Sequence, residues 1–315
     1  MVIRLHSPDK DCCDENRRRN FFMQQRKRRK RKLRKRGYVV LALMGVMMFW
    51  GACRLVGTVS GILWDAGVIS AETIGSSKYE IGAPQVLNES QVTKKLYALS
   101  QKYPEMKSVY EKREKYPKKL LAALCNNPDM IDFVKGYLSS GSKVSDHLTA
   151  KECAGGVPLL IQWDKRWGYA SYGDNNIALS GCAPTCLSMV IVGLTGNRKA
   201  TPYQVARFAE ENGYYVEGTG TAWSIMTEGA ASYGIRGKEI PLSESNVVSE
   251  LESGHPIICS MKAGDFTTSG HFIVLTGTKD GKIKVNDPNS PARSCLWNYG
   301  TLEGQIRNLW AFCKG

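Results

Sequence analysis

The chain has 315 residues, 23% charged and 43% hydrophobic, which is enough for one or two globular domains with accessory segments. Its net charge of +14 is concentrated in residues 1–37, which hold 15 Lys/Arg against 4 Asp/Glu, whereas the remainder holds 28 against 25. A nucleic-acid-binding domain carries its basic residues on the folded surface. The charge distribution therefore argues against nucleic acid as a partner, except through the arm itself.

An apolar stretch follows the basic arm directly. Residues 38–53 carry no charge, and the apolar character continues beyond Arg54 to residue 64. Sixteen helical residues cover only about 24 Å, so we expect Arg54 to extend toward the interface while later residues complete the span. The sequence therefore predicts a cytoplasmic arm over residues 1–37 that contacts anionic lipid, a single transmembrane helix over residues 38–64, and an extracytoplasmic remainder.

Two other interpretations of this region fit less well. The basic arm is much longer than the positively charged start of a cleaved signal peptide. Gly51 and Ala52 precede Cys53 as in a lipoprotein site, but Trp50 stands where a branched aliphatic residue is wanted. We therefore expect a single-pass protein of the cell membrane.

Residues 65–151 are predicted to form a stalk followed by a helical spacer. The first part is rich in Gly and Ser and has weak periodicity. Pro104, Pro117 and Pro128 then mark helix starts, so that residues 88–141 contain three or four short helices with one apolar face. These helices are too few to form a core of their own. We expect them to pack against the next domain, or to act as a spacer or pro-segment.

Residues 152–315 have a mixed α and β pattern. Residues 182–194 are apolar nearly all round, which predicts a buried helix. Asp280 and Gly281 predict a hairpin turn. Because helices precede antiparallel strands, the sequence predicts an α+β domain. A second helix is predicted to begin at residue 201, and a third to cover residues 222–233. The predicted strands are 257–261, 271–276, 282–286 and a closing strand at 309–313.

The cysteine and histidine pattern excludes several site classes. The predicted extracytoplasmic part holds seven cysteines, an odd number that leaves one thiol free even with complete pairing. There is no CxxC, the chain has only four histidines, and Gly218-Thr219-Gly220 is too short for a phosphate-binding loop. We therefore expect neither a metal nor an organic cofactor. The seven cysteines are Cys125, Cys153, Cys182, Cys186, Cys259, Cys295 and Cys313.

Cys182 is the strongest candidate nucleophile. It stands at the predicted start of a buried helix, with Pro184 in the first turn, where the helix dipole favours a reactive thiolate. His271 opens a predicted strand, and Asp287 ends the strand that follows it in the hairpin. The two should therefore meet, which predicts a Cys-His-Asp triad. His255 is the competing base, but no acidic residue follows it on a hairpin.

These motifs resemble papain-fold cysteine peptidases related to the bacteriocin leader (double-glycine) peptidases, in their stand-alone, exported branch. The resemblance covers about residues 152–315. It implies a papain-like domain in a bacterial membrane protein, with Cys182 as nucleophile, His271 as base and then acid, Asp287 as the residue that orients the imidazole, and Gln162 as an oxyanion donor. The motifs are Gln162-Trp163-Asp164-Lys165-Arg166-Trp167, Gly181-Cys182-Ala183-Pro184-Thr185, Gly270-His271-Phe272 and Asn286-Asp287-Pro288.

This sequence departs from the family pattern at two positions. Ala183 replaces the usual Gly, and Cys186 stands where a small Ala or Ser is usual, so it is a possible competing thiol. The expected activity is that of a cysteine peptidase or amidase, which hydrolyses peptide bonds outside the membrane in a secreted peptide, a surface protein or the peptide part of the cell wall. The alternative is a non-catalytic peptide-binding or scaffold module of a secretion or conjugation apparatus. Candidate aromatic residues of a substrate groove are Trp163, Trp167, Tyr214, Tyr215 and Trp223.

Overall fold

The computed structural model describes residues 77–141 and 144–315. The predicted basic arm and transmembrane helix lie outside these residues. Within the described part, no helix combines the length and the apolar content that a membrane crossing requires. Contacts divide the chain into Met1–Thr73 and Ile74–Gly315, and the described residues all belong to the second unit.

Three of the helix starts in residues 89–140 lie where the proline signals place them. Asn88 caps the first helix with a capping box. The Asn88 side chain accepts a hydrogen bond from the backbone N–H of Gln91, and the Gln91 side chain accepts one from the backbone N–H of Asn88. Pro104, Pro117 and Pro128 stand at or just before later starts. The elements are α3 (Glu89–Lys102), η3 (Pro104–Met106), α4 (Lys107–Glu111), η4 (Arg113–Lys115), α5 (Lys118–Asn126), η5 (Pro128–Met130) and α6 (Ile131–Ser140).

These helices share one hydrophobic cluster, whose members include the almost fully buried Leu96, Leu120 and Phe133. Burying a side chain of this size stabilises the fold by roughly 1.5–3 kcal/mol. The cluster continues into the following domain at Ala178, and Phe133 stacks on Tyr169 with ring centroids 4.3 Å apart. The helices therefore share a hydrophobic core that continues into the next domain, and they pack against that domain as one of the expectations from sequence proposed.

An antiparallel sheet with strand order β5-β10-β6-β7-β8-β9 forms the centre of the C-terminal part of the chain. Asp280 and Gly281, with φ of 53° and 71°, form the turn between β7 and β8 that the Asp-Gly pair predicts. The closing strand lies inside the sheet, between β5 and β6, rather than at an edge. The strands are β5 (Ile235–Glu239), β6 (Ile257–Lys262), β7 (Gly270–Lys279), β8 (Lys282–Asn286), β9 (Leu296–Trp297) and β10 (Ile306–Lys314).

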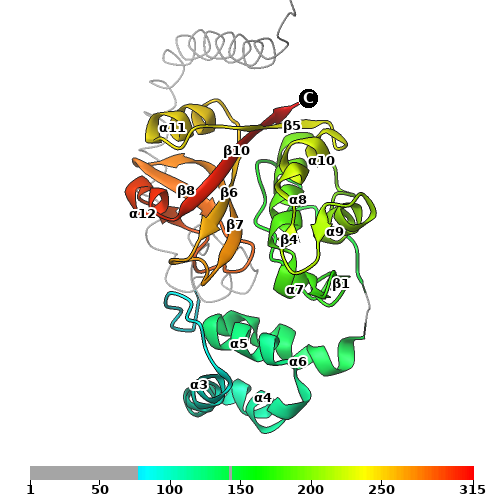
Figure 1. Cartoon of the computed structure of the whole chain (residues 1–315), viewed down its shortest axis with the longest axis vertical. Coiled ribbons are helices and arrows are strands. Elements are labelled where there is room, and N and C mark those ends of the chain that lie inside the picture. Colours follow the sequence, from blue (N-terminus) through cyan, green and yellow to red (C-terminus); the bar gives the residue numbers. More distant parts are fainter. Residues whose placement is uncertain (1–76, 142–143) are drawn as a thin grey trace, which may run out of the picture. The chain divides into compact units, whose positions relative to one another are not determined.

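Helices cover both faces of this sheet (Figure 1). Alternate residues of a strand point to opposite faces, so Ile258 and Val274 pack with α8 and α9, whereas Ile257 and Leu275 pack with α11 and α12. The predicted α+β class with an antiparallel sheet is confirmed. The remaining elements are α7 (Ile177–Ser180), α8 (Cys182–Thr195), α9 (Pro202–Glu211), α11 (Glu244–Glu252) and α12 (Tyr299–Glu303), with the short hairpins β1 (Ser171–Tyr172)–β2 (Asn175–Asn176) and β3 (Tyr215–Val216)–β4 (Gly220–Thr221).

The helix predicted over residues 222–233 is not continuous. The structure has a 3-10 helix η6 (Trp223–Met226) and a short α10 (Glu228–Ala231) in its place. The next strand, β5, passes so close that a Cβ at Gly237 would lie 1.8 Å from the Met226 carbonyl oxygen. This tertiary contact, which helical periodicity does not reveal, accompanies the break between the two short helices.

Candidate active site

Cys182 is the first residue of α8, a 14-residue helix. Gly181 precedes it in a turn so tight that a Cβ at position 181 would lie 2.6 Å from the Ile177 carbonyl oxygen. The first N–H groups of an α-helix have no intrahelical acceptor, and its N-terminus favours negative charge. Cys182 thus lies at the end of the helix that carries the positive pole of its dipole. The side chain is partly exposed, so a substrate can reach it.

The β7–β8 hairpin brings His271 and Asp287 together, as the sequence predicts. His271 is the second residue of β7, and Asp287 directly follows β8. His271 Nε2 donates a hydrogen bond to Asp287 Oδ1 at 2.7 Å. His271 is 7% exposed and Asp287 is fully buried, so this ion pair is shielded from water.

The surroundings of His271 favour its protonated form. Burial alone lowers the pKa of His271, because it disfavours a charged imidazolium. The charge of Asp287 and its hydrogen bond, together with a hydrogen bond to Cys182, outweigh burial and raise the pKa of His271 to about 10. Because Asp287 occupies Nε2, the ring nitrogen left for the thiol is Nδ1. Asp287, His271 and the Cys182 thiol thus form one chain of interactions, which is an arrangement that could support nucleophilic catalysis.

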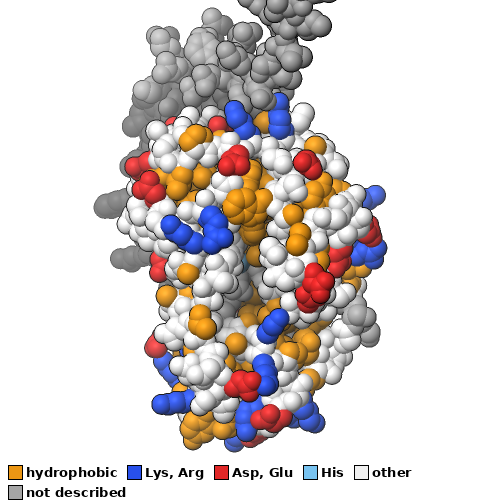
Figure 2. All heavy atoms as spheres, in the orientation of Figure 1, with side chains coloured by type: hydrophobic (Ala, Val, Ile, Leu, Met, Phe, Trp, Pro, Cys, Tyr) orange, Lys and Arg blue, Asp and Glu red, His pale blue; other side chains and the backbone are white. Residues whose placement is uncertain are grey.

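Cys182 and His271 line one open cleft with a volume of about 870 Å³. One wall comes from α7, the start of α8 and the β3–β4 hairpin, and the other from β6, β7 and β10. Figure 2 shows this face of the molecule hollowed along its middle. This volume lies within the range of ligand-binding pockets in proteins.

Gln162 lies beside this site but does not line the cleft in the described residues. Its backbone N–H donates to the Pro288 carbonyl oxygen at 2.8 Å, which ties it to the residue after Asp287. Its side-chain amide donates to the Ala178 carbonyl oxygen at 2.7 Å, and the side chain is 4% exposed. One amide hydrogen is therefore occupied, and only the other remains for an oxyanion.

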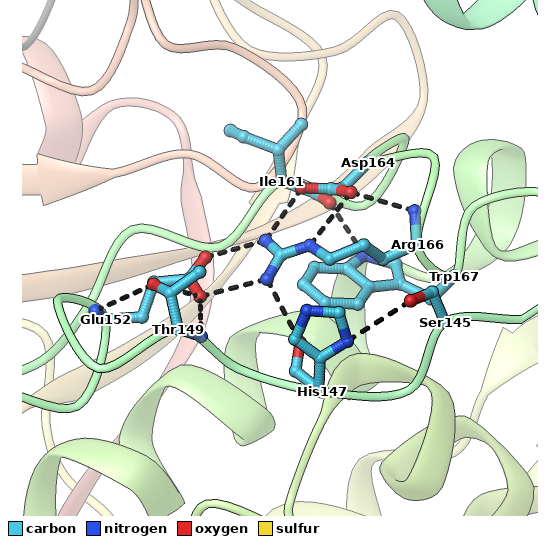
Figure 3. A network of polar contacts seen from close by, with 8 residues as sticks. All are labelled: Ser145, His147, Thr149, Glu152, Ile161, Asp164, Arg166 and Trp167. Carbon is cyan, nitrogen blue, oxygen red and sulfur yellow. Dashed lines mark hydrogen bonds and ion pairs between the residues drawn. The ribbon is translucent and has the colours of Figure 1, made fainter.

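The motif around Gln162 also anchors the preceding boundary segment (Figure 3). Arg166 Nη2 lies 2.7 Å from Glu152 and 2.8 Å from Asp164, and the Arg166 guanidinium stacks 4.2 Å from the centre of the Trp167 ring. The Trp167 indole N–H donates to the Ile161 carbonyl oxygen at 2.9 Å. These contacts are partly buried, so the network holds the backbone on both sides of Gln162 in place.

Neither departure from the family pattern disturbs this geometry. Among the described residues other than glycine, only Asp280 has a positive φ, so Ala183 adopts an ordinary backbone conformation. Cys186 is fully buried, and burial raises the pKa of its thiol well above the usual value. It is therefore a poor competitor for Cys182, because the thiolate is the reactive form.

His255 has an acidic partner that the sequence analysis missed. Its Nδ1 lies 2.6 Å from Glu250 Oε2, from the preceding helix α11 rather than a following strand. His255 does not line the cleft that holds Cys182. It therefore lacks the nucleophile, not the carboxylate, that a catalytic histidine needs.

The cleft is lined by aromatic and basic side chains from parts of the chain that are far apart in the sequence. Tyr215 and Trp223 line the cleft, as the sequence analysis considered, whereas Trp167 is fully buried. Lys119 and Arg307 also line it, from α5 and β10. No local signal marks these two residues, because only the tertiary fold brings their elements to the cleft.

Residues 155–311 match the model of the Peptidase_C39 like family. A search of curated proteins finds no match for the chain. Among solved structures, the peptidase domain of Streptococcus ComA, a bi-functional ABC transporter involved in a quorum sensing pathway, is 16% identical with a TM-score of 0.33. The match covers 42% of this chain and 93% of that one.

Two further solved structures give similar values. A C39-like peptidase from Bacillus anthracis is 14% identical with a TM-score of 0.34, over 50% of this chain and 95% of that one. A double glycine motif protease from an AMS/PCAT transporter, in complex with the leader peptide, is 15% identical with a TM-score of 0.33. That match covers 54% of this chain and 98% of the other.

Proposed function

Residues 155–311 belong to the Peptidase_C39 like family, and from this premise we propose that the chain is a cysteine peptidase that hydrolyses peptide bonds with Cys182, His271 and Asp287. The observation that carries the proposal is the hydrogen-bonded His271–Asp287 pair beside a partly exposed cysteine at a helix N-terminus. All three side chains lie at one open cleft or directly behind it.

In the first half of the reaction the Cys182 thiolate attacks the carbonyl carbon of the scissile bond. The oxyanion that forms is held by the free N–H groups at the start of α8. Gln162, the donor that the family resemblance implies, lies beside the cleft and can contribute only its remaining amide hydrogen. His271 gives its proton to the amine nitrogen as the C–N bond breaks. The products are a free amine and a thioester on Cys182.

In the second half a water molecule replaces the amine. His271 takes one proton from this water, whose oxygen attacks the thioester carbonyl. The C–S bond breaks, the acid product leaves, and Cys182 returns to the thiolate beside an imidazolium. Asp287 keeps Nε2 protonated throughout, so that Nδ1 alone exchanges the proton.

The direct test is the rate at which iodoacetamide labels Cys182 between pH 5 and 9 in the purified chain, with the labelled residue identified by mass spectrometry. We expect fast labelling near pH 6, because the neighbouring imidazolium stabilises the thiolate. His271→Ala should lose this fast phase and label like an ordinary thiol, whose pKa is about 8.5.

Cys153 provides an internal control for this measurement, because it is also partly exposed but does not line the cleft. Its labelling should be the same in wild type and His271→Ala. If Cys182 in the wild type reacts no faster than Cys153 near pH 6, the peptidase proposal is wrong. A non-catalytic peptide-binding module would then be the better interpretation of the cleft.

We also propose that the domain is anchored on the outer side of a bacterial cell membrane. The support is the sequence pattern of a basic segment directly before an apolar one. In bacterial cells the full chain should sediment with membranes, and protease added to spheroplasts should degrade residues 77–315. If the Lys and Arg residues of 26–36 are replaced by Gln, part of the chains should insert in the opposite orientation, with residues 77–315 protected from the protease. Protection of the domain in spheroplasts of the wild type would contradict the proposal.

A further inference from the structure

The helical segment, residues 77–141, contacts the loop that carries Asp287. The Asn127 side chain is 1% exposed, and its amide donates to the Asn289 carbonyl oxygen. The backbone N–H of Asn289 donates to Asp287 Oδ1 at 2.8 Å. This is the same carboxylate oxygen that accepts from His271 Nε2. A continuous path thus leads from Asn127 to the imidazole, through three hydrogen bonds and the backbone of one residue, Asn289.

Asn127 is itself held firmly at the end of α5. Its backbone N–H donates to the Ala123 carbonyl oxygen at 2.8 Å, and its own carbonyl oxygen accepts from Met130 at 3.1 Å. The Asn289 carbonyl oxygen receives a second donor, the indole N–H of Trp163, at 2.8 Å. One hydrogen-bond donor to the Asn289 carbonyl oxygen therefore comes from the helical segment, and the other comes from residues 155–311.

A second contact joins the helical segment to the same loop. Arg293 is 7% exposed, and its Nη2 donates to the Gly82 carbonyl oxygen at 3.0 Å. Asp129 and Asp287 both act electrostatically on Arg293. Buried charges and amides interact strongly because water does not screen them. The helical segment is thus built into the polar region directly behind the His271–Asp287 pair.

From these contacts we infer that the helical segment is an integral part of the working site, with Asn127 as a positioning residue that acts on His271 through Asn289 and Asp287. The inference rests on the proposed peptidase function. The segment lies before residues 155–311, so the family-matched part of the chain does not include this support. The sequence allowed packing against the next domain, a spacer or a pro-segment; these contacts favour the first and give the segment a structural role in catalysis.

The test compares Asn127→Ala and Asn127→Leu with Asn126→Ala in the full chain. Leucine keeps the approximate shape of asparagine and removes the donor. Asn126 is the matched control, because it exchanges two hydrogen bonds with the backbone of Gln85, at 2.9 and 3.1 Å, and has none to the Asp287 loop in the described residues. The readouts are the pH profile of Cys182 labelling by iodoacetamide and the thermal unfolding temperature.

Both Asn127 variants should label Cys182 about five- to tenfold more slowly near pH 6, the effect of one buried hydrogen bond. The profile should shift to higher pH, because a misplaced Asp287 stabilises the imidazolium less. The groups that act on this pair are Cys182 and Cys186 in α8 and Arg293 in the loop, and none of them changes in these variants. Asn126→Ala should match the wild-type profile.

A merely structural role would lower the unfolding temperature without moving the pH profile of the folded fraction. The inference is therefore wrong if both Asn127 variants label Cys182 with the wild-type profile at a temperature where they are folded. If the wild type itself shows no fast labelling, it is the peptidase proposal that fails. The two failures are thus distinguishable from one set of measurements.

Discussion

Cys182→Ala is expected to abolish peptide hydrolysis, with kcat falling by about 10⁵–10⁶, as when a peptidase loses its nucleophile. The physical reason is that alanine offers no atom to form the thioester, and the remaining groups only bind and polarise the substrate. The measurement is turnover of a peptide library by the purified chain, with wild type and variant compared at equal folded concentration.

Cys186→Ala is the matched control, because Cys186 lies one helical turn from Cys182 in the same helix. It is fully buried, so its replacement should cost about 1 kcal/mol of stability and leave turnover nearly unchanged. Equal losses of turnover in the two variants would show that neither thiol acts as a specific nucleophile. Retained turnover in Cys182→Ala would exclude the proposed mechanism.

Asp287→Asn is expected to lower kcat by about 10³–10⁴ while the fold is preserved. Asparagine has nearly the same shape, but it removes the negative charge 2.7 Å from His271 Nε2. The histidine can then present the wrong tautomer to the thiol. Steady-state kinetics of the variant, with circular dichroism to verify folding, measures the effect.

The pH dependence of this variant follows from the pKa of His271. In the wild type the pKa of His271 is raised from 6.5 to about 10. Protonated His271 therefore contributes to the free energy of unfolding, fully below pH 6.5, and this contribution is lost as the pH rises through about 10. Without the Asp287 charge the pKa falls. The basic limb of kcat/KM should therefore move to lower pH, and the stability that His271 contributes near pH 7 should decrease. An unchanged basic limb would show that Asp287 does not act on the imidazole.

The candidate site could be predicted largely because its residues lie in strong local patterns. Cys182 stands at the start of an apolar helix, and the helix begins there in the structure. His271 and Asp287 belong to one hairpin with an Asp-Gly turn, so that turn chemistry and strand pairing alone bring them together. Local sequence was sufficient because a hairpin places its two ends side by side whatever surrounds it.

Other features could not be predicted in this way. His255 has Glu250 of the preceding helix as its partner, whereas the sequence pattern excluded only an acidic partner on a following hairpin strand. Gln162 was expected to face the oxyanion, but part of its amide is occupied by the Ala178 carbonyl oxygen. The position of β10 inside the sheet depends on long-range pairing with β5 and β6. Each of these contacts joins segments whose proximity leaves no periodic signal in the sequence.

The sequence by itself determined the α+β class, the helix starts at Pro104, Pro117 and Pro128, and the hairpin that pairs His271 with Asp287. These features depend on local propensity, capping and alternation, which act within a few residues. Only the tertiary structure decided that Asn127 touches the loop of Asp287, 160 residues further along the chain. Such a contact arises from how apolar surfaces pack together, and that packing depends on the whole fold.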